Sequence, residues 1–165
     1  AKCLWGRDCA GARLMTSAEP KSLKLLAKDG ADLTVMSACL QDALAPVGDI
    51  TWLKGEQRVI IAFNRFMWEQ GGEDSGGELI YYRIHSVLSI EGVARVRSRG
   101  FSLDESDRML SFMSLRPLDG GIDLIFADDI HIRVETDDIA AALADQGAAW
   151  PTRWKPDHDL DSNDP

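Results

Sequence analysis

The stretch from Ile50 to Glu135 constrains the fold most, because apolar and polar side chains alternate along six or seven of its segments. In the clearest segment, Ile130 to Glu135, every second side chain is aliphatic and the others are polar. Successive side chains of a β-strand point to opposite faces of a sheet, so this period of two predicts strands with one dry and one wet face. The series predicts an α+β fold built on a small antiparallel barrel or sandwich of about seven strands.

The predicted strands are separated by short polar or glycine-rich links that favour turns. A glycine-rich link at 71–77 is expected to be a flexible hairpin tip, because its own carboxylates would repel a phosphate group. The strands are expected at Ile50–Leu53, Val59–Trp68, Ile80–Ile90, Val93–Arg99, Met109–Leu118, Ile122–Ala127 and Ile130–Glu135.

An N-terminal strand and helix are expected before this series. Leu23–Ala27 reads as a short strand, and apolar side chains recur at helical spacing from Leu33 to Leu44 after a predicted N-cap at Asp32. Pro46 is expected to stop this helix, because proline cannot continue the helical hydrogen bonds. The helix is expected to cover one face of the Val59–Trp68 strand.

A second helix is expected to cap the sheet after Asp137. Two acids stand at its start, Ile139 and Leu143 lie on one side, and Gly147 is a natural C-cap. This order of a strand-helix unit, seven strands and a capping helix is similar to that of pleckstrin-homology-like barrels, and the comparison is one of element order alone.

Length and composition predict one globular domain. The chain has 165 residues, within the usual range of about 100–200 per domain. We expect a disordered extension at 1–21, a single barrel-like domain at 22–154 and an acidic disordered tail at 155–165. Three cysteines and no apolar leader favour a reducing, cytoplasmic setting.

The net charge and the distribution of apolar residues limit the kinds of partner that the protein is expected to bind. A net charge of −9 argues against nucleic-acid binding, and the sequence has no apolar run long enough for a membrane span. The three histidines, His85, His131 and His158, have no metal-site spacing, so neither a metal nor a cofactor is expected. The expected partner is a protein or a small anionic ligand, and a homodimer is compatible with the sequence.

Three arginines form the strongest candidate site. Arg95, Arg97 and Arg99 repeat at two-residue spacing, so they share one face of their strand. They either pair with acids of neighbouring strands, for which Glu69, Glu73, Asp74 and Glu78 are candidates, or form a recognition patch for an anion. Arg65 and Trp68 are candidates for extending the patch; Trp68 equally fits a side chain that seals the rim of the barrel.

These features favour a non-catalytic binding or adaptor module that recognises an acidic protein segment or a small anion through its arginine-bearing face. No catalytic residue is assigned, because the sequence has no nucleophile motif. The alternative is a small enzyme with a groove in which His85 or His131 meets a carboxylate.

Four short motifs in the chain are typical of one family: Leu23–Ala27, Ser37–Ala43, Asn64–Glu69 and Val96–Gly100. They span most of the chain from Ser22 to about Trp154. Through them the chain resembles a bacterial family of uncharacterised proteins, the domain-of-unknown-function family numbered twenty-nine forty-eight. The resemblance implies no activity. The extension before Met15 and the link at 71–77 depart from the family pattern, so both are expected to be peripheral.

Overall fold

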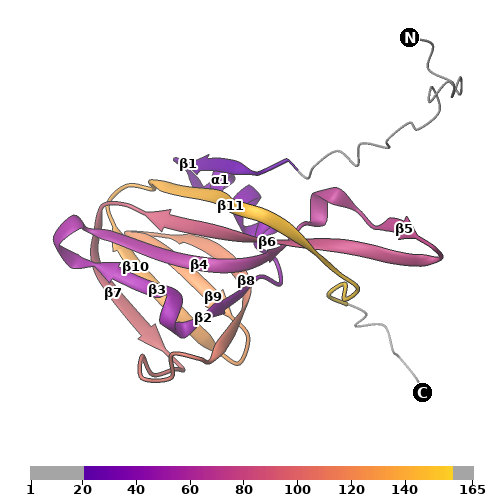
Figure 1. The fold of residues 1–165 in the computed structure, drawn as a ribbon. Helices are drawn as coiled ribbons and strands as arrows, with labels where there is room; N and C mark the ends of the chain where they lie inside the picture. The colour runs from indigo at the N-terminus through magenta and orange to yellow at the C-terminus, as the bar shows by residue number, and fades with distance from the viewer. Residues whose placement is uncertain (1–20, 158–165) are drawn as a thin grey trace, which may run out of the picture.

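The computed structural model describes residues 21–157 and consists of one α-helix, three single-turn 3₁₀ helices and eleven β-strands (Figure 1). The expected disordered extension, apart from Lys21, and the tail after Asp157 lie outside the described residues. The elements are β1 Lys24–Ala27, α1 Gly30–Cys39, β2 Leu44–Pro46, η1 Val47–Asp49, β3 Ile50–Leu53, η2 Lys54–Glu56, β4 Arg58–Phe66, η3 Trp68–Gln70, β5 Glu73–Ser75, β6 Glu78–Ile90, β7 Val93–Arg99, β8 Met109–Leu118, β9 Gly121–Phe126, β10 Ile130–Thr136 and β11 Ala141–Thr152.

All strand pairs are antiparallel and join into one open sheet. Its order is β1-β11-β6-β4-β2-β8-β9-β10-β7, with β3 paired to β4 and β5 paired to β6. Within residues 21–157 this path ends at β1 and β7, which do not pair with each other, so the structure is a curled sheet rather than a closed barrel. The α+β class and the antiparallel pairing are as the alternation predicts.

The sheet curls around a single core. Figure 1 shows β4, β6 and β11 in front of β8, β9 and β10, and inward side chains from both groups belong to one buried cluster. Phe112 on β8 lies edge-on to Phe63 on β4 and to Phe126 on β9, with ring centroids 5.5 and 5.7 Å apart. Edge-to-face rings at this separation add to the stability gained by burial, and the Phe63–Phe112 contact joins the two parts of the sheet.

The strands of the alternating region form largely where the sequence predicts them. β3 and β4 make the expected hairpin, in which Ile50 lies opposite Ile61. β8, β9 and β10 make the expected meander. The glycine-rich link contains the short strand β5 and makes a hairpin with the start of β6, with left-handed backbone at Gly76 and Gly77.

The N-terminal helix differs from its prediction at both ends. Its N-cap is Asp29 rather than Asp32, because the Asp29 carboxylate accepts a hydrogen bond from the Asp32 amide at 2.8 Å. The helix ends at Cys39, and a left-handed residue, Asp42, redirects the chain into β2, which lies between β4 and β8. α1 packs on β8 and β1 instead of on β4.

The predicted C-terminal capping helix is wrong, because its residues form β11, a 12-residue strand between β1 and β6. Ala141, Leu143 and Asp145 are buried while the side chains between them are partly exposed, which is the period of a strand. Gly147, expected as a helix cap, is left-handed within a bulge between Gln146 and Trp150. This correction removes the helix on which the comparison with pleckstrin-homology-like barrels depended.

Candidate functional site

The candidate site is the outer face of β7 and its neighbours, where the predicted arginines lie together. Arg95, Arg97 and Arg99 are exposed by 60%, 62% and 65% of their side-chain surface. The opposite parity of the strand carries Ala94, Val96 and Ser98, of which Val96 is partly buried and packs against the core. Inward packing of Val96 therefore turns all three guanidinium groups toward solvent.

β10 and β9 place further charged side chains on the same face. Arg133 lies directly opposite Arg97 in the register, and Asp123 on β9 lies opposite Arg133. His131 lies opposite Arg99, and Arg116 on β8 lies opposite Asp123. We call this outer surface the basic face; its ionisable residues are Arg95, Arg97, Arg99, Arg116, Asp123, Asp129, His131, Arg133 and Glu135.

The β7 arginines pair with carboxylates other than those that the sequence analysis names. Glu135 on β10 lies 3.9 Å from the Nε of Arg95 and 3.1 Å from the Nε of Arg97, so one carboxylate serves two guanidinium groups. Asp129, in the link between β9 and β10, lies 2.6 Å from the Nη2 of Arg99. Exposed pairs such as these contribute about 0.2–1 kcal/mol each, so they leave the cations largely available to a ligand.

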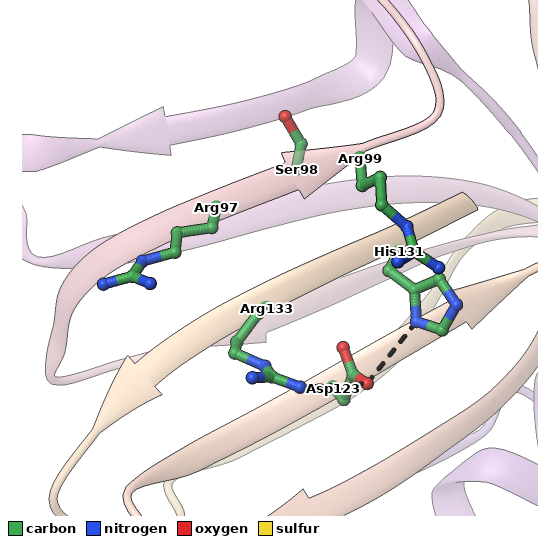
Figure 2. Close-up of a pocket in the computed structure, with 6 residues that line it drawn as sticks. All are labelled: Arg97, Ser98, Arg99, Asp123, His131 and Arg133. Carbon is green, nitrogen blue, oxygen red and sulfur yellow. Dashed lines mark ion pairs between the residues drawn. The ribbon is translucent and has the colours of Figure 1, made fainter. Parts of the chain in front are cut away.

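A hollow of about 290 Å³ lies at the centre of the basic face, lined by Arg97, Ser98, Arg99, Asp123, His131 and Arg133. Figure 2 shows β7 along one side of it, β10 across it and Asp123 at its floor. The Asp123 Oδ2 atom lies 3.5 Å from His131 Nδ1 and 3.8 Å from Arg133 Nη2. Asp123 Oδ1 is buried and has no hydrogen-bond partner among the described residues.

Arg65 does not extend the basic face, because its side chain is fully buried on the inner side of β4. Its Nε and Nη2 atoms donate to Asp145 on β11 at 3.0 and 2.7 Å, and its two Nη atoms donate to Glu69 at 2.9 and 2.8 Å. Asp145 also accepts hydrogen bonds from Ser86 Oγ and from the Leu23 amide. This cluster joins β4, β6, β11 and the chain that leads into β1.

The ionisation of the cluster follows from these bonds. Burial on its own would raise the pKa of Asp145, but hydrogen bonds from Arg65, Ser86 and the Leu23 amide hold that pKa below its ordinary value. Burial would lower the pKa of Arg65, but the bonds to Glu69 and Asp145 raise it. Both groups are therefore charged at neutral pH, and the cluster is an internal ion pair with no exposed cation for a ligand.

Trp68 belongs to the same end of the sheet as Arg65 and lies outside the basic face. Its ring packs against Phe66 with centroids 4.6 Å apart, and its Nε1 donates to the Gln41 carbonyl at 3.0 Å. The indole thus ties η3 to the segment after α1. This position fits the rim-sealing role that the sequence analysis gives as the alternative to binding.

The two described histidines have different surroundings. His85 packs on the ring of Trp150, with centroids 4.6 Å apart. His131 has a carboxylate at each ring nitrogen, Asp123 near Nδ1 and Asp129 near Nε2 at 3.3 Å. Both ring nitrogens of His131 therefore face carboxylates of the protein itself.

The described residues also bear on metal binding, membrane insertion and thiol chemistry. Residues 21–157 contain no group of three or more histidine, cysteine or acidic side chains that could hold a metal ion. No helix in this range has the length and apolar character that crossing a membrane requires. The burial of Cys39 raises the pKa of its thiol, which disfavours the reactive thiolate.

Fold and site together define a β-rich α+β protein with a basic patch on the outer face of a curled antiparallel sheet. Comparison with known proteins gives its family. The model of the family described as "Protein of unknown function (DUF2948)" matches residues 23–158, so the chain belongs to this uncharacterised family. No curated protein and no solved structure matches the chain.

Proposed function

We propose that this protein is a non-catalytic binding module that recognises an acidic protein segment through the basic face. The observation that carries the proposal is the excess of positive charge there: five arginines share the surface with three carboxylates, Asp123, Asp129 and Glu135. The protein as a whole has a net charge of −9, so this local positive field is a departure from the rest of the molecule.

The geometry of β7 supports an extended segment as the ligand. Alternate side chains of an extended chain are spaced about 6.6–7 Å apart, so carboxylates at every second position would match the spacing of the three arginines. β7 pairs with β10 alone in the described sheet, and past Val93, whose amide donates to the Gln57 carbonyl, its other edge has no partner strand and could accept an added one. Main-chain hydrogen bonds along such an edge give affinity, and the side chains of the partner strand give specificity.

The direct test is calorimetry with a synthetic oligoglutamate peptide at low salt. The Arg97→Ala/Arg99→Ala variant is expected to bind about tenfold more weakly, since two exposed charge contacts of about 0.7 kcal/mol each sum to that factor. Arg58→Ala/Arg153→Ala is the matched control, because it removes the same charge from β4 and from the residue after β11, and it is expected to bind as the native protein does. Equal affinity of the two double variants would refute the proposal.

Salt dependence gives an independent check. The basic-face contacts are exposed, so affinity is expected to fall steeply as the screening length shortens to about 8 Å near 0.15 M salt. An affinity that does not change with salt concentration would indicate an apolar contact elsewhere on the sheet.

A small anion is the second candidate ligand, and the hollow between β7 and β10 favours it. Flat charged surfaces bind extended partners, whereas a hollow ringed by guanidinium groups can surround a single oxyanion. The enzyme alternative gains less support, because both nitrogens of His131 face carboxylates of the protein itself. The cytoplasmic setting and the homodimer stay predictions of the sequence.

A further inference from the structure

We propose that the hollow on the basic face selects a phosphoryl group that still carries a proton, and that Asp123 accepts a hydrogen bond from that P–OH group. This inference rests on the proposed function, since it needs the basic face to bind anions. It goes further by naming the chemistry of the group bound in the hollow and the residue that discriminates.

The hollow has the room and the cations for a tetrahedral oxyanion. Its volume of about 290 Å³ is many times the roughly 10–15 Å³ that one water molecule needs in a cavity. Arg97 lies directly opposite Arg133, and like charges in facing positions of neighbouring strands destabilise a sheet. An anion between them would relieve this repulsion, and the guanidinium fork matches two oxygens of a phosphoryl group.

Asp123 is the unexpected member of the site. It places a negative charge at the floor of a hollow whose rim attracts anions, and its side chain is only 11% exposed. Its Oδ1 atom is buried with no hydrogen-bond partner among the described residues, and Oδ2 is 3.5 Å from His131 Nδ1 and 3.8 Å from Arg133 Nη2. A buried acceptor left without a donor costs free energy, so the site favours a ligand that brings a donor.

A protonated phosphoryl group can bind both the arginines and the carboxylate of the hollow. Its charged oxygens can accept hydrogen bonds from Arg99 and Arg133, and its hydroxyl can donate to Asp123. Sulfate has the same shape and charge as hydrogen phosphate but carries no proton at neutral pH, so it would set an oxygen against the carboxylate. The side chains that flank Asp123 in Figure 2, Arg133 and His131, are 54% and 28% exposed, so a ligand can displace them at modest cost.

The charged groups around the hollow come from every neighbouring element. Arg97 and Arg99 face it from β7, His131 and Arg133 from β10, and Asp123 from β9. Asp129 in the β9–β10 link holds Arg99 and His131, and Arg116 on β8 lies opposite Asp123 in the register. The pH dependence tested below belongs to the proton of the ligand and does not require titration of these groups.

The experiment compares inorganic phosphate with sulfate by calorimetry on the full chain at pH 7 and matched ionic strength. Phosphate is expected to bind about tenfold or more tightly, the factor that one hydrogen bond to a charged acceptor gives. In Asp123→Asn the side-chain amide can donate to sulfate, so the preference is expected to disappear. Asp128→Asn is the matched control, because it makes the same change on an exposed neighbour with left-handed backbone, and it is expected to keep the preference.

A phosphate ester distinguishes the two sources of such a group. An ester loses its last proton near about pH 6, whereas free phosphate keeps one well above neutral pH. Phenyl phosphate is therefore expected to bind at acidic pH and to weaken about tenfold above its own titration, while inorganic phosphate does not. An ester that binds equally well on both sides of that titration would contradict the role of the proton.

The outcomes separate this inference from the proposed function. Equal binding of phosphate and sulfate by the native protein overturns the role of Asp123 and leaves an unselective anion site. Binding of oligoglutamate without binding of either ion overturns the hollow as a phosphoryl site and leaves the binding module standing. If the Asp123→Asn variant fails to fold, the phosphate and sulfate comparison on the native protein still decides the question.

Discussion

Replacing Asp145 with alanine is the sharpest test of what holds this sheet together. The change leaves the guanidinium of Arg65 buried without its internal partner and removes the acceptor for Ser86 and the Leu23 amide. Removing one partner of a buried ion pair costs about 3–5 kcal/mol, because the remaining charge stays desolvated. Glu69 keeps its two hydrogen bonds to Arg65, so the lower part of that range, about 3–4 kcal/mol, is expected.

Urea unfolding followed by circular dichroism measures this cost. With a typical slope of about 2 kcal/mol/M, a loss of about 4 kcal/mol moves the midpoint down by about 2 M. The control is Glu135→Ala, which removes an exposed partner of Arg95 and Arg97 and is expected to cost less than about 1 kcal/mol. A cost below about 1 kcal/mol for Asp145→Ala would refute the account of the buried cluster.

A compensating variant gives a second view of the same cluster. Arg65→Met/Asp145→Leu replaces both charges with apolar groups, so no buried charge is left without a partner. It is expected to be more stable than Asp145→Ala alone, since apolar replacement of a buried ion pair is often neutral or stabilising.

Three further outcomes follow from the structure. The pKa of Asp145 is held below its ordinary value, so its contribution to the free energy of unfolding is present above the unfolded pKa of about 3.9. That contribution is lost as the pH falls through the lower folded pKa. The urea midpoints of the native protein and of Asp145→Asn should therefore converge below about pH 4. Phe112→Ala removes a fully buried ring between two others, and calorimetric unfolding should show a loss of about 3–5 kcal/mol; a loss under about 1 kcal/mol would count against the packing described. Gly121→Ala would place a methyl group against the Val134 carbonyl oxygen of β10, so a loss of at least about 2 kcal/mol is expected in denaturant unfolding, and native stability would contradict that close approach.

Strand periodicity made most of the sheet predictable. β7 begins and ends at the residues that the sequence analysis gives, and β8 does too. Each is followed by a turn signal, Gly100 after β7 and Asp119-Gly120 after β8. Three strands, β2, β5 and β11, could not be predicted in this way. β2 and β5 have three residues each, too few to show a period, and both lie inside segments with another local signal.

β11 was not predictable in the same way, because its sequence is ambiguous. The run Ala140–Ala144 contains four alanines that suit either a helix or a strand, and the two acids before it resemble a helix start. Its inward positions include Asp145, which breaks the apolar pattern of a strand. That carboxylate is buried only because Arg65 on β4 neutralises it, a pairing between residues 80 positions apart in the sequence.

The candidate site, like the sheet, could be predicted only in part from the sequence. The shared face of Arg95, Arg97 and Arg99 follows from local alternation, and the structure places them so. The sequence also indicates that Arg65 is buried, because it shares the parity of Val59, Ile61 and Phe63 and so points into the core with them. That parity is the signal for a buried arginine.

The remainder of the site depends on long-range pairing. The alternation in β10 puts His131 and Arg133 on one face, but it does not say that β7 pairs with β10 from 30 or more residues earlier in the chain. Without that pairing, the carboxylates Glu135 and Asp129 could not be assigned to the arginines, and the hollow with Asp123 at its floor could not be found.

The most direct test of the basic face is a nuclear magnetic resonance titration that follows the backbone amides and the arginine Nε–Hε groups. Inorganic phosphate and oligoglutamate are added in turn to the native protein at low salt. The account predicts that the shifted signals cluster on β7, β9 and β10, with Arg97, Arg99 and Arg133 among them, while Arg58 and Arg153 stay in place. Shifts spread evenly over all exposed arginines, or gathered on another part of the sheet, would contradict it.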